Sequence, residues 1–565
     1  MTPRIAFAAA LALALATGCP RPQPPPPLPA PPDENETLRP EARRLAQQAE
    51  ALLRDQDERI WKAWTEGAEP ELAQSYQGRD QLFSAANIRK IDRLRQISSD
   101  AQEVRALTHL LVYFVGERLS AQLADLNEAQ ANLESALTFT ASGKEHRYRE
   151  LERLLANEPG AAERRALYSG ATVAVERLTP LLRRRDERIH AVLQELGYPS
   201  YEAFGAELRQ VDLDRLGLLA DEILQLTRPA YLQVMDELSR RELSIPFSEV
   251  RRPDLPRLFR PRGVDAFFPA EAILPRAQET LSGAGVPVSS IPGFRIDSAA
   301  RPRKNPRPLT VAPIVPGDVR LSFLPRPGLH AQASLLHELG HALHLAFTRE
   351  KRFELAKLGA GAQSEAFADL FEDLVEDPVW LEEKAGLSGD RLTAYLWATS
   401  AHKLFMVRSA AGHLLYQLEL RRRGGEDAKA VYKAIMERTF ELPLTDEDAE
   451  RYLADTEDFF QSADEFRGWF LAAQIQAQLK ARFGPRWWGT GAAGAFLQSL
   501  WAFGTALNAR ELAVRVGDDG VRPDVLLLRL ATTLKVPMKL SAKLAREPDP
   551  QPARLPEAAP DAGSP

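Results

Sequence analysis

The sequence predicts a mainly α-helical protein that carries one small β-hairpin. Long segments place apolar residues three and four positions apart, with Lys, Arg, Glu and Gln between them, which is typical of amphipathic helices. The clearest of these segments are 46–64, 88–114, 119–137, 161–196 and 213–238. Strand-like sequence is sparse, and the 565 residues are 44% hydrophobic and 27% charged, as in water-soluble globular proteins. The composition excludes collagen-like, wholly disordered and polytopic membrane proteins.

The chain begins with a segment typical of an export signal. A basic residue precedes the uncharged stretch from Ile5 to Leu15, and small residues then lead to Cys19. This apolar stretch is too short to span a bilayer, which needs about 20 residues. The pattern resembles a bacterial lipoprotein signal, in which residues 1–18 are removed and Cys19 carries the lipid. The alternative is that Cys19 is a buried free cysteine.

Proline-rich segments flank the predicted helical body. Nine of the thirteen residues from Pro20 to Pro32 are proline, so this stretch must be extended and cannot form a core. We interpret residues 19–40 as the lipidated cysteine and a linker, which together hold the protein on a membrane of the bacterial cell envelope. Residues 547–565 are predicted to be a disordered, proline-rich tail. The body divides into an N-terminal helical part, 41–290, and a C-terminal part, 291–546.

The charge balance and the single cysteine exclude several classes of partner and site. The chain has 72 basic and 78 acidic residues, a net charge of −6, which gives no reason to expect nucleic acid as a partner. One cysteine cannot form an intrachain disulfide, a thiolate zinc cluster or a redox pair. Any metal in the folded body must therefore be held by nitrogen and oxygen. No pattern predicts an oligomeric state.

A β-hairpin is predicted shortly before the most informative helix. The segments 308–314 and 319–323 read as strands, and Val-Pro-Gly-Asp between them is a turn sequence. If the protein binds peptides, such a hairpin offers an edge for strand addition.

The helix after the hairpin contains the motif H-E-x-x-H. Positions four apart lie on one face of a helix, so His337 and His341 can present two imidazole nitrogens to one metal ion. Glu338 projects beside them, where it can take a proton from metal-bound water. The flanking residues are nearly all apolar, which indicates burial, and a buried carboxylate beside two imidazoles needs compensation. The pattern predicts one zinc ion per chain; the alternative is a structural histidine pair.

The third zinc ligand is predicted on the next helix. Glu365, Asp369 and Glu372 fall at positions i, i+4 and i+7 and form one acidic stripe among Ala, Phe and Leu. A solvated acidic face is the alternative, but so much apolar surface favours burial and hence cationic partners for the stripe. We expect Glu365 to bind the metal, and Asp369 and Glu372 to accept from the remaining N–H groups of the two ligand imidazoles.

The metal motif and its surroundings resemble the gluzincin peptidases of the thimet oligopeptidase and oligoendopeptidase type, and their relatives of the angiotensin-converting-enzyme type. H-E-x-G-H is followed by Glu365, 24 residues after His341. Glu365-Ala-x-x-Asp369 is similar to the converting-enzyme pattern, and the interval from Glu365 to Glu372 matches the oligopeptidase pattern. The likeness covers about residues 290–535, whereas the N-terminal part shares only its helical character.

The resemblance implies a large two-lobed helical fold with a deep cleft and a small sheet beside the H-E-x-x-H helix. It also implies zinc-dependent hydrolysis of oligopeptides with Glu338 as general base. One departure concerns the segment 459–469, which lacks the tyrosine and histidine that usually stabilise the oxyanion in these peptidases. Candidate substitutes are Tyr452, Arg467, His402 and His413, each of which could instead be structural.

Three functions therefore remain open. The favoured one is an active zinc oligopeptidase. The missing tyrosine motivates a second, a zinc-binding but catalytically weak lipoprotein that binds peptides or acts as a scaffold. The third is a purely structural helical lipoprotein, which would contain no stoichiometric zinc.

Overall fold

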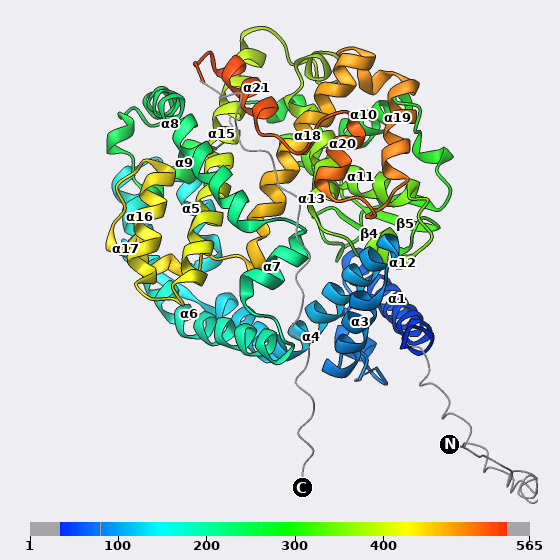
Figure 1. The fold of residues 1–565 in the computed structure, drawn as a ribbon. Coiled ribbons are helices and arrows are strands. Elements are labelled where there is room, and N and C mark those ends of the chain that lie inside the picture. The colour runs from blue at the N-terminus through cyan, green and yellow to red at the C-terminus, as the bar shows by residue number, and fades with distance from the viewer. Residues whose placement is uncertain (1–33, 80, 261–262, 539–565) are drawn as a thin grey trace, which may run out of the picture.

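The computed structural model confirms a mainly α-helical protein, in which helices hold 72% of the residues and strands 5% (Figure 1). It describes residues 34–79, 81–260 and 263–538. The predicted signal, Cys19 and the predicted tail 547–565 lie outside these ranges. Within them, no helix combines the length and the apolar character that crossing a membrane requires.

Helices of ten or more residues carry most of the fold. They are α1 (Glu34–Glu66), α3 (Ala85–Ile97), α4 (Ala101–Ala136), α6 (Ala161–Glu195), α8 (Leu213–Leu243), α10 (Ala270–Gly283), α11 (Leu329–Phe347), α13 (Ala362–Glu372), α15 (Gly389–Arg422), α16 (Ala428–Phe440), α18 (Gln461–Phe483), α19 (Gly491–Trp501) and α21 (Asp524–Leu534). Shorter α-helices connect them, namely α2 (Leu72–Ser75), α5 (Leu151–Asn157), α7 (Tyr201–Arg209), α9 (Leu255–Leu258), α12 (Phe353–Lys357), α14 (Pro378–Trp380), α17 (Asp446–Ala449) and α20 (Ala509–Val516).

Two sequence predictions of helix boundaries were wrong. The predicted helix 88–114 is divided, because Ser98 adopts an extended conformation and the Asp100 side chain accepts the Glu103 N–H to cap α4. At the N-terminus, α1 begins at Glu34, inside the range 19–40 predicted as a linker. The dense proline run ends at Pro32, before α1 begins, and α1 itself accommodates Pro40.

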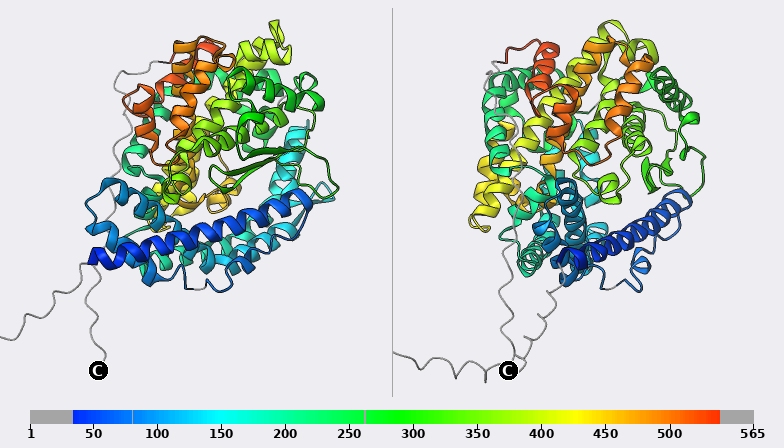
Figure 2. Two further views of the ribbon diagram at one scale, coloured as in Figure 1. Left: turned by 90° about the vertical axis from the view of Figure 1, so that its right-hand side faces the viewer. Right: turned by 45° about the vertical axis from the view of Figure 1, so that its right-hand side comes forward.

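The helices pack around one main hydrophobic core. Helices α1, α3, α4 and α6 lie along one side of the molecule, where each contacts the next (Figures 1 and 2). Helix α15 packs against α8, α16 and α18, and α13 is held between α11 and α18. The main cluster of buried apolar side chains includes residues from Ala42 to Val536. This core therefore runs through both predicted parts, 41–290 and 291–546.

A three-stranded sheet lies beside α11. It contains β3 (Phe294–Asp297), β4 (Leu309–Ile314) and β5 (Asp318–Ser322) in the order β3-β5-β4. The antiparallel β4–β5 hairpin was predicted, whereas β3, which is parallel to β5, was not. Edge strand β4 contacts both α1 and α11. A second hairpin, β1 (Thr138–Ala141) and β2 (Lys144–Arg147), was also missed, because its strands are short and largely exposed.

Candidate metal centre

Helices α11 and α13 touch through their backbones at Gly340. A Cβ atom on Gly340 would lie 2.4 Å from the Phe367 carbonyl oxygen and 2.5 Å from the Ala368 Cα. Only glycine allows this approach, since real Cβ atoms do not come so close to a backbone. Because Gly340 lies between the two histidines of the motif in α11, the contact brings the histidine face of α11 against α13.

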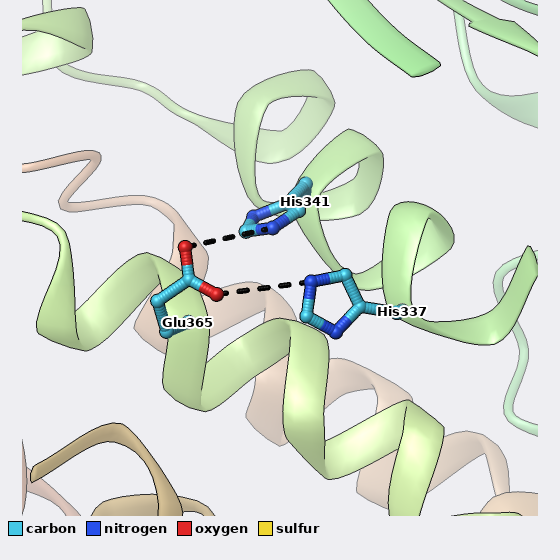
Figure 3. A group of neighbouring side chains, drawn as sticks. All are labelled: His337, His341 and Glu365. Carbon is cyan, nitrogen blue, oxygen red and sulfur yellow. Dashed lines mark ion pairs between the residues drawn. The ribbon is translucent and has the colours of Figure 1, made fainter. Parts of the chain in front are cut away.

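His337, His341 and Glu365 converge at this contact (Figure 3). The His337 Nε2 lies 3.7 Å from Glu365 Oε2, and the His341 Nε2 lies 3.9 Å from Glu365 Oε1. These separations are too long for hydrogen bonds but suit an ion that binds each ligand atom at about 2.0–2.2 Å. Two imidazoles and one carboxylate are a donor set that zinc accepts, and they leave a fourth position open for water. The residues therefore fit the predicted metal group.

Hydrogen bonds at the Nδ1 atoms orient both imidazoles. The His337 Nδ1 lies 2.8 Å from Glu372 Oε2 and 3.7 Å from Asp369 Oδ1. The His341 Nδ1 lies instead 2.9 Å from Ser364 Oγ. These contacts occupy the Nδ1 atoms and leave the Nε2 atoms for a metal.

The prediction that Asp369 and Glu372 serve both imidazoles was wrong for His341. Because α13 begins at Ala362, Ser364 already lies in its first turn and reaches the second histidine of α11. Ser364 was missed at the sequence level, although its position next to Glu365 was a usable signal.

Glu338 lies on the same turn of α11 as the two histidines. Its backbone carbonyl accepts a hydrogen bond of 3.0 Å from the Thr310 hydroxyl of β4, which ties the motif helix to the edge strand. The side chain is half-buried, and its carboxylate forms no hydrogen bond or ion pair with the residues that the structure describes.

The two imidazoles have opposite electrostatic environments. Burial disfavours the charged form of His337, but the bond to Glu372 and the charges of Asp369 and Glu365 outweigh it and raise the pKa of His337 to about 9. Burial, followed by the charge of His337, lowers the pKa of His341 to about 3. The raised pKa of His337 means that zinc competes with a proton for this imidazole at neutral pH.

This difference predicts how the stability of the metal-free protein depends on pH. The pKa of His337 is about 9 in the folded state against 6.5 for an ordinary histidine, so its stabilising contribution is complete below pH 6.5 and is lost as the pH rises through 9. The other histidines whose pKa is shifted have lowered pKa values, so their titration changes the stability of the fold only below pH 6.5. They are His109, His190, His341, His344 and His402. We expect the melting temperature of chelator-treated protein to fall between pH 6.5 and 9.

Differential scanning fluorimetry across this pH range tests the expectation, with His337→Gln as the control that should flatten the curve. Zinc affinity should change in the opposite direction and rise with pH, because binding releases the His337 proton. A melting temperature that rises from pH 6.5 to 9 in the metal-free protein would contradict the assignment of that proton to His337.

The four residues considered as substitute oxyanion donors form contacts with other parts of the fold. The Tyr452 hydroxyl accepts a hydrogen bond from Arg183, and the Arg467 guanidinium donates to the Arg209 carbonyl. The His402 ring stacks on Phe259, and the His413 Nδ1 bonds the Ser409 carbonyl within α15. In the described part of the chain, none of these contacts joins the four candidates to the metal group.

Helix α18 packs against α13 beside the metal group. A Cβ atom on Gly468 would lie 3.0 Å from Glu365 Cβ and 3.5 Å from Asp369 Oδ2. Where α18 packs against Glu365 it therefore presents a glycine, which has no donor side chain. Comparison with family models and with curated proteins found no match for this chain.

Proposed function

We propose that this protein is a zinc-dependent metallopeptidase that hydrolyses oligopeptides. The observation that best supports this proposal is the convergence of His337, His341 and Glu365. The Nδ1 atoms of both histidines already have hydrogen-bond partners, and the Glu338 carboxylate has none among the described residues. A structural histidine pair would not require a half-buried carboxylate facing both Nε2 atoms. We further assign the chain to the two-lobed gluzincin fold with a deep cleft, on the strength of the motif resemblance.

The residues around the metal centre have distinct roles in the proposed reaction. His337, His341 and Glu365 would hold zinc, which when bound lowers the pKa of a coordinated water and polarises a peptide carbonyl. Glu338 accepts the proton of the attacking water and later delivers it to the leaving amine. Glu372 and Ser364 keep the imidazoles in the orientation that this chemistry needs.

A second function is favoured by one specific observation. Helix α18 presents Gly468 to Glu365, and segment 459–469 contains neither tyrosine nor histidine. Loss of one oxyanion donor typically lowers the rate by about 10²- to 10³-fold. The alternative is therefore a zinc-binding, catalytically weak lipoprotein that binds peptides or acts as a scaffold. In both cases Cys19 would anchor the protein through lipid to a membrane of the bacterial cell envelope.

Removal and return of the metal test the proposed function. We expect the full chain to contain about one zinc per molecule, to cleave a quenched oligopeptide library and to lose this activity to a chelator. Added zinc should restore it, because the three ligands come from two helices that hold their arrangement through packing. Elemental analysis and fluorescence assays measure both quantities. Stoichiometric zinc without cleavage would favour the second function, and absence of zinc would contradict both.

A further inference from the structure

Four carboxylates crowd together behind the metal centre. Asp369 and Glu372 lie on α13, and Asp373 and Glu376 follow on the 3₁₀ turn Asp373–Glu376. Asp369 and Asp373 are both buried, and Asp369 and Glu372 are the two that face His337. Buried carboxylates this close together repel one another and lose hydration, so they need cations nearby.

Two cations from distant parts of the chain reach this cluster. The Arg529 guanidinium of α21 bonds Asp373 Oδ2 at 2.8 Å and Gln476 Oε1 at 2.9 Å. The Lys403 ammonium of α15 lies 3.8 Å from Asp373 Oδ1 and 5.3 Å from the centre of the Trp469 ring. Hydrogen bonds hold Arg529 to Asp373. The Lys403 ammonium, by contrast, forms no hydrogen bond with any described residue and meets Asp373 only at the longer ion-pair distance.

Among the four carboxylates Lys403 forms its ion pair with Asp373, and its charge also acts on the other three, which lie on the same side of α13 and the following turn. Its side chain is only 18% exposed, and burial opposes its charge. The carboxylates nevertheless outweigh burial and raise the pKa of Lys403 above its ordinary value, in the order Asp373, Glu376, Asp369 and Glu372. Burial raises the pKa of Asp369 well above its ordinary value, and Lys403 is the foremost charge that opposes this rise. The indole face of Trp469 on α18 adds a favourable contact on the other side of the ammonium.

We propose that Lys403 is a positioning residue of the metal centre, whose charge lets Asp369 and Glu372 remain together behind His337 and hold its imidazole toward the metal. This role rests on the proposed function, because it requires a metal at His337, His341 and Glu365. Lys403 itself contacts neither these ligands nor Glu338 in any ion pair within the described residues. Its influence passes through the carboxylates that contact His337.

The test compares Lys403→Met with Lys384→Met in the full chain. Lys384 is a matched control, because its ammonium lies 3.2 Å from Glu279 and 5.7 Å from the Trp488 ring centre and its side chain is 22% exposed, but neither partner belongs to the carboxylate cluster. Zinc affinity is measured by competition with a chromophoric chelator. We expect about tenfold weaker zinc binding in Lys403→Met, by analogy with partners of metal ligands. Lys384→Met should bind zinc as the wild type does.

Lys403→Arg distinguishes charge from packing, since it keeps the cation and should retain affinity within about threefold of the wild type. If Lys403→Met fails to fold, Lys403→Gln replaces it with the same expected loss. Wild-type zinc affinity in a folded, charge-removed variant would overturn the positioning role alone, and so would an equal loss in Lys403→Arg. Absence of zinc binding in the wild type would overturn the proposed function and this role together.

Discussion

Replacement of Glu338 by glutamine is expected to lower peptide hydrolysis by about 10²- to 10⁴-fold while zinc binding stays unchanged. Glutamine keeps the shape of the side chain but cannot accept the proton of the attacking water. The Glu338 carboxylate has no ion pair or hydrogen bond to any residue the structure describes, so its neutralisation leaves no charged partner alone. The loss should therefore appear in the rate and not in stability or metal content.

Glu354→Gln is the matched control for this substitution. Glu354 is also a half-buried glutamate, but it lies on α12, away from the metal centre. We expect its variant to cleave peptides at close to the wild-type rate. Turnover of a quenched peptide and zinc content are measured on the same preparations. An active Glu338→Gln enzyme would remove Glu338 from the role of general base, and a variant without zinc would assign it to holding the centre together.

The candidate ligand set could be predicted because its signals are local. The spacing of His337 and His341 follows from the helix repeat, and Glu365 belongs to an acidic stripe on a helix whose other positions are largely Ala, Phe and Leu. The helices α6 and α8 were likewise expected, because long apolar stripes define them. The break before α4 also had a local signal, since Ser98-Ser99-Asp100 is a sequence that favours capping over continued helix.

What could not be predicted depends on the rotation and approach of distant segments. Ser364 reaches His341 only because α13 is rotated against α11 in a particular way. Strand β3 pairs with β5 across more than 20 residues and is itself only four residues long. Lys403 and Trp469 meet behind α13 from helices far apart in sequence. Periodicity defines which face of a helix is buried but not which residue of another helix it meets.

Gly340 shows how such an approach controls the metal centre. Alanine at this position is expected to lower the free energy of unfolding by about 1–3 kcal/mol, because its Cβ would overlap backbone atoms of α13 at 2.4–2.5 Å. Backbone cannot rotate away as a side chain can, so α11 and α13 must separate. The gaps of 3.7 and 3.9 Å between the histidines and Glu365 would then widen, and most zinc binding should be lost.

The expected loss of stability in Gly340→Ala is opposite to the usual effect of this substitution in a helix, which makes the prediction specific. In an ordinary helix, replacing glycine by alanine stabilises the protein by up to about 1 kcal/mol. Gly116 in α4 is such a position, because its Cβ would meet nothing within 4 Å, and Gly116→Ala should raise the melting temperature and leave zinc affinity unchanged. Denaturant unfolding of the metal-free proteins and chelator competition separate the two effects. A Gly340→Ala variant that gained stability and kept its zinc affinity would show that close contact of α11 and α13 does not hold the ligands together.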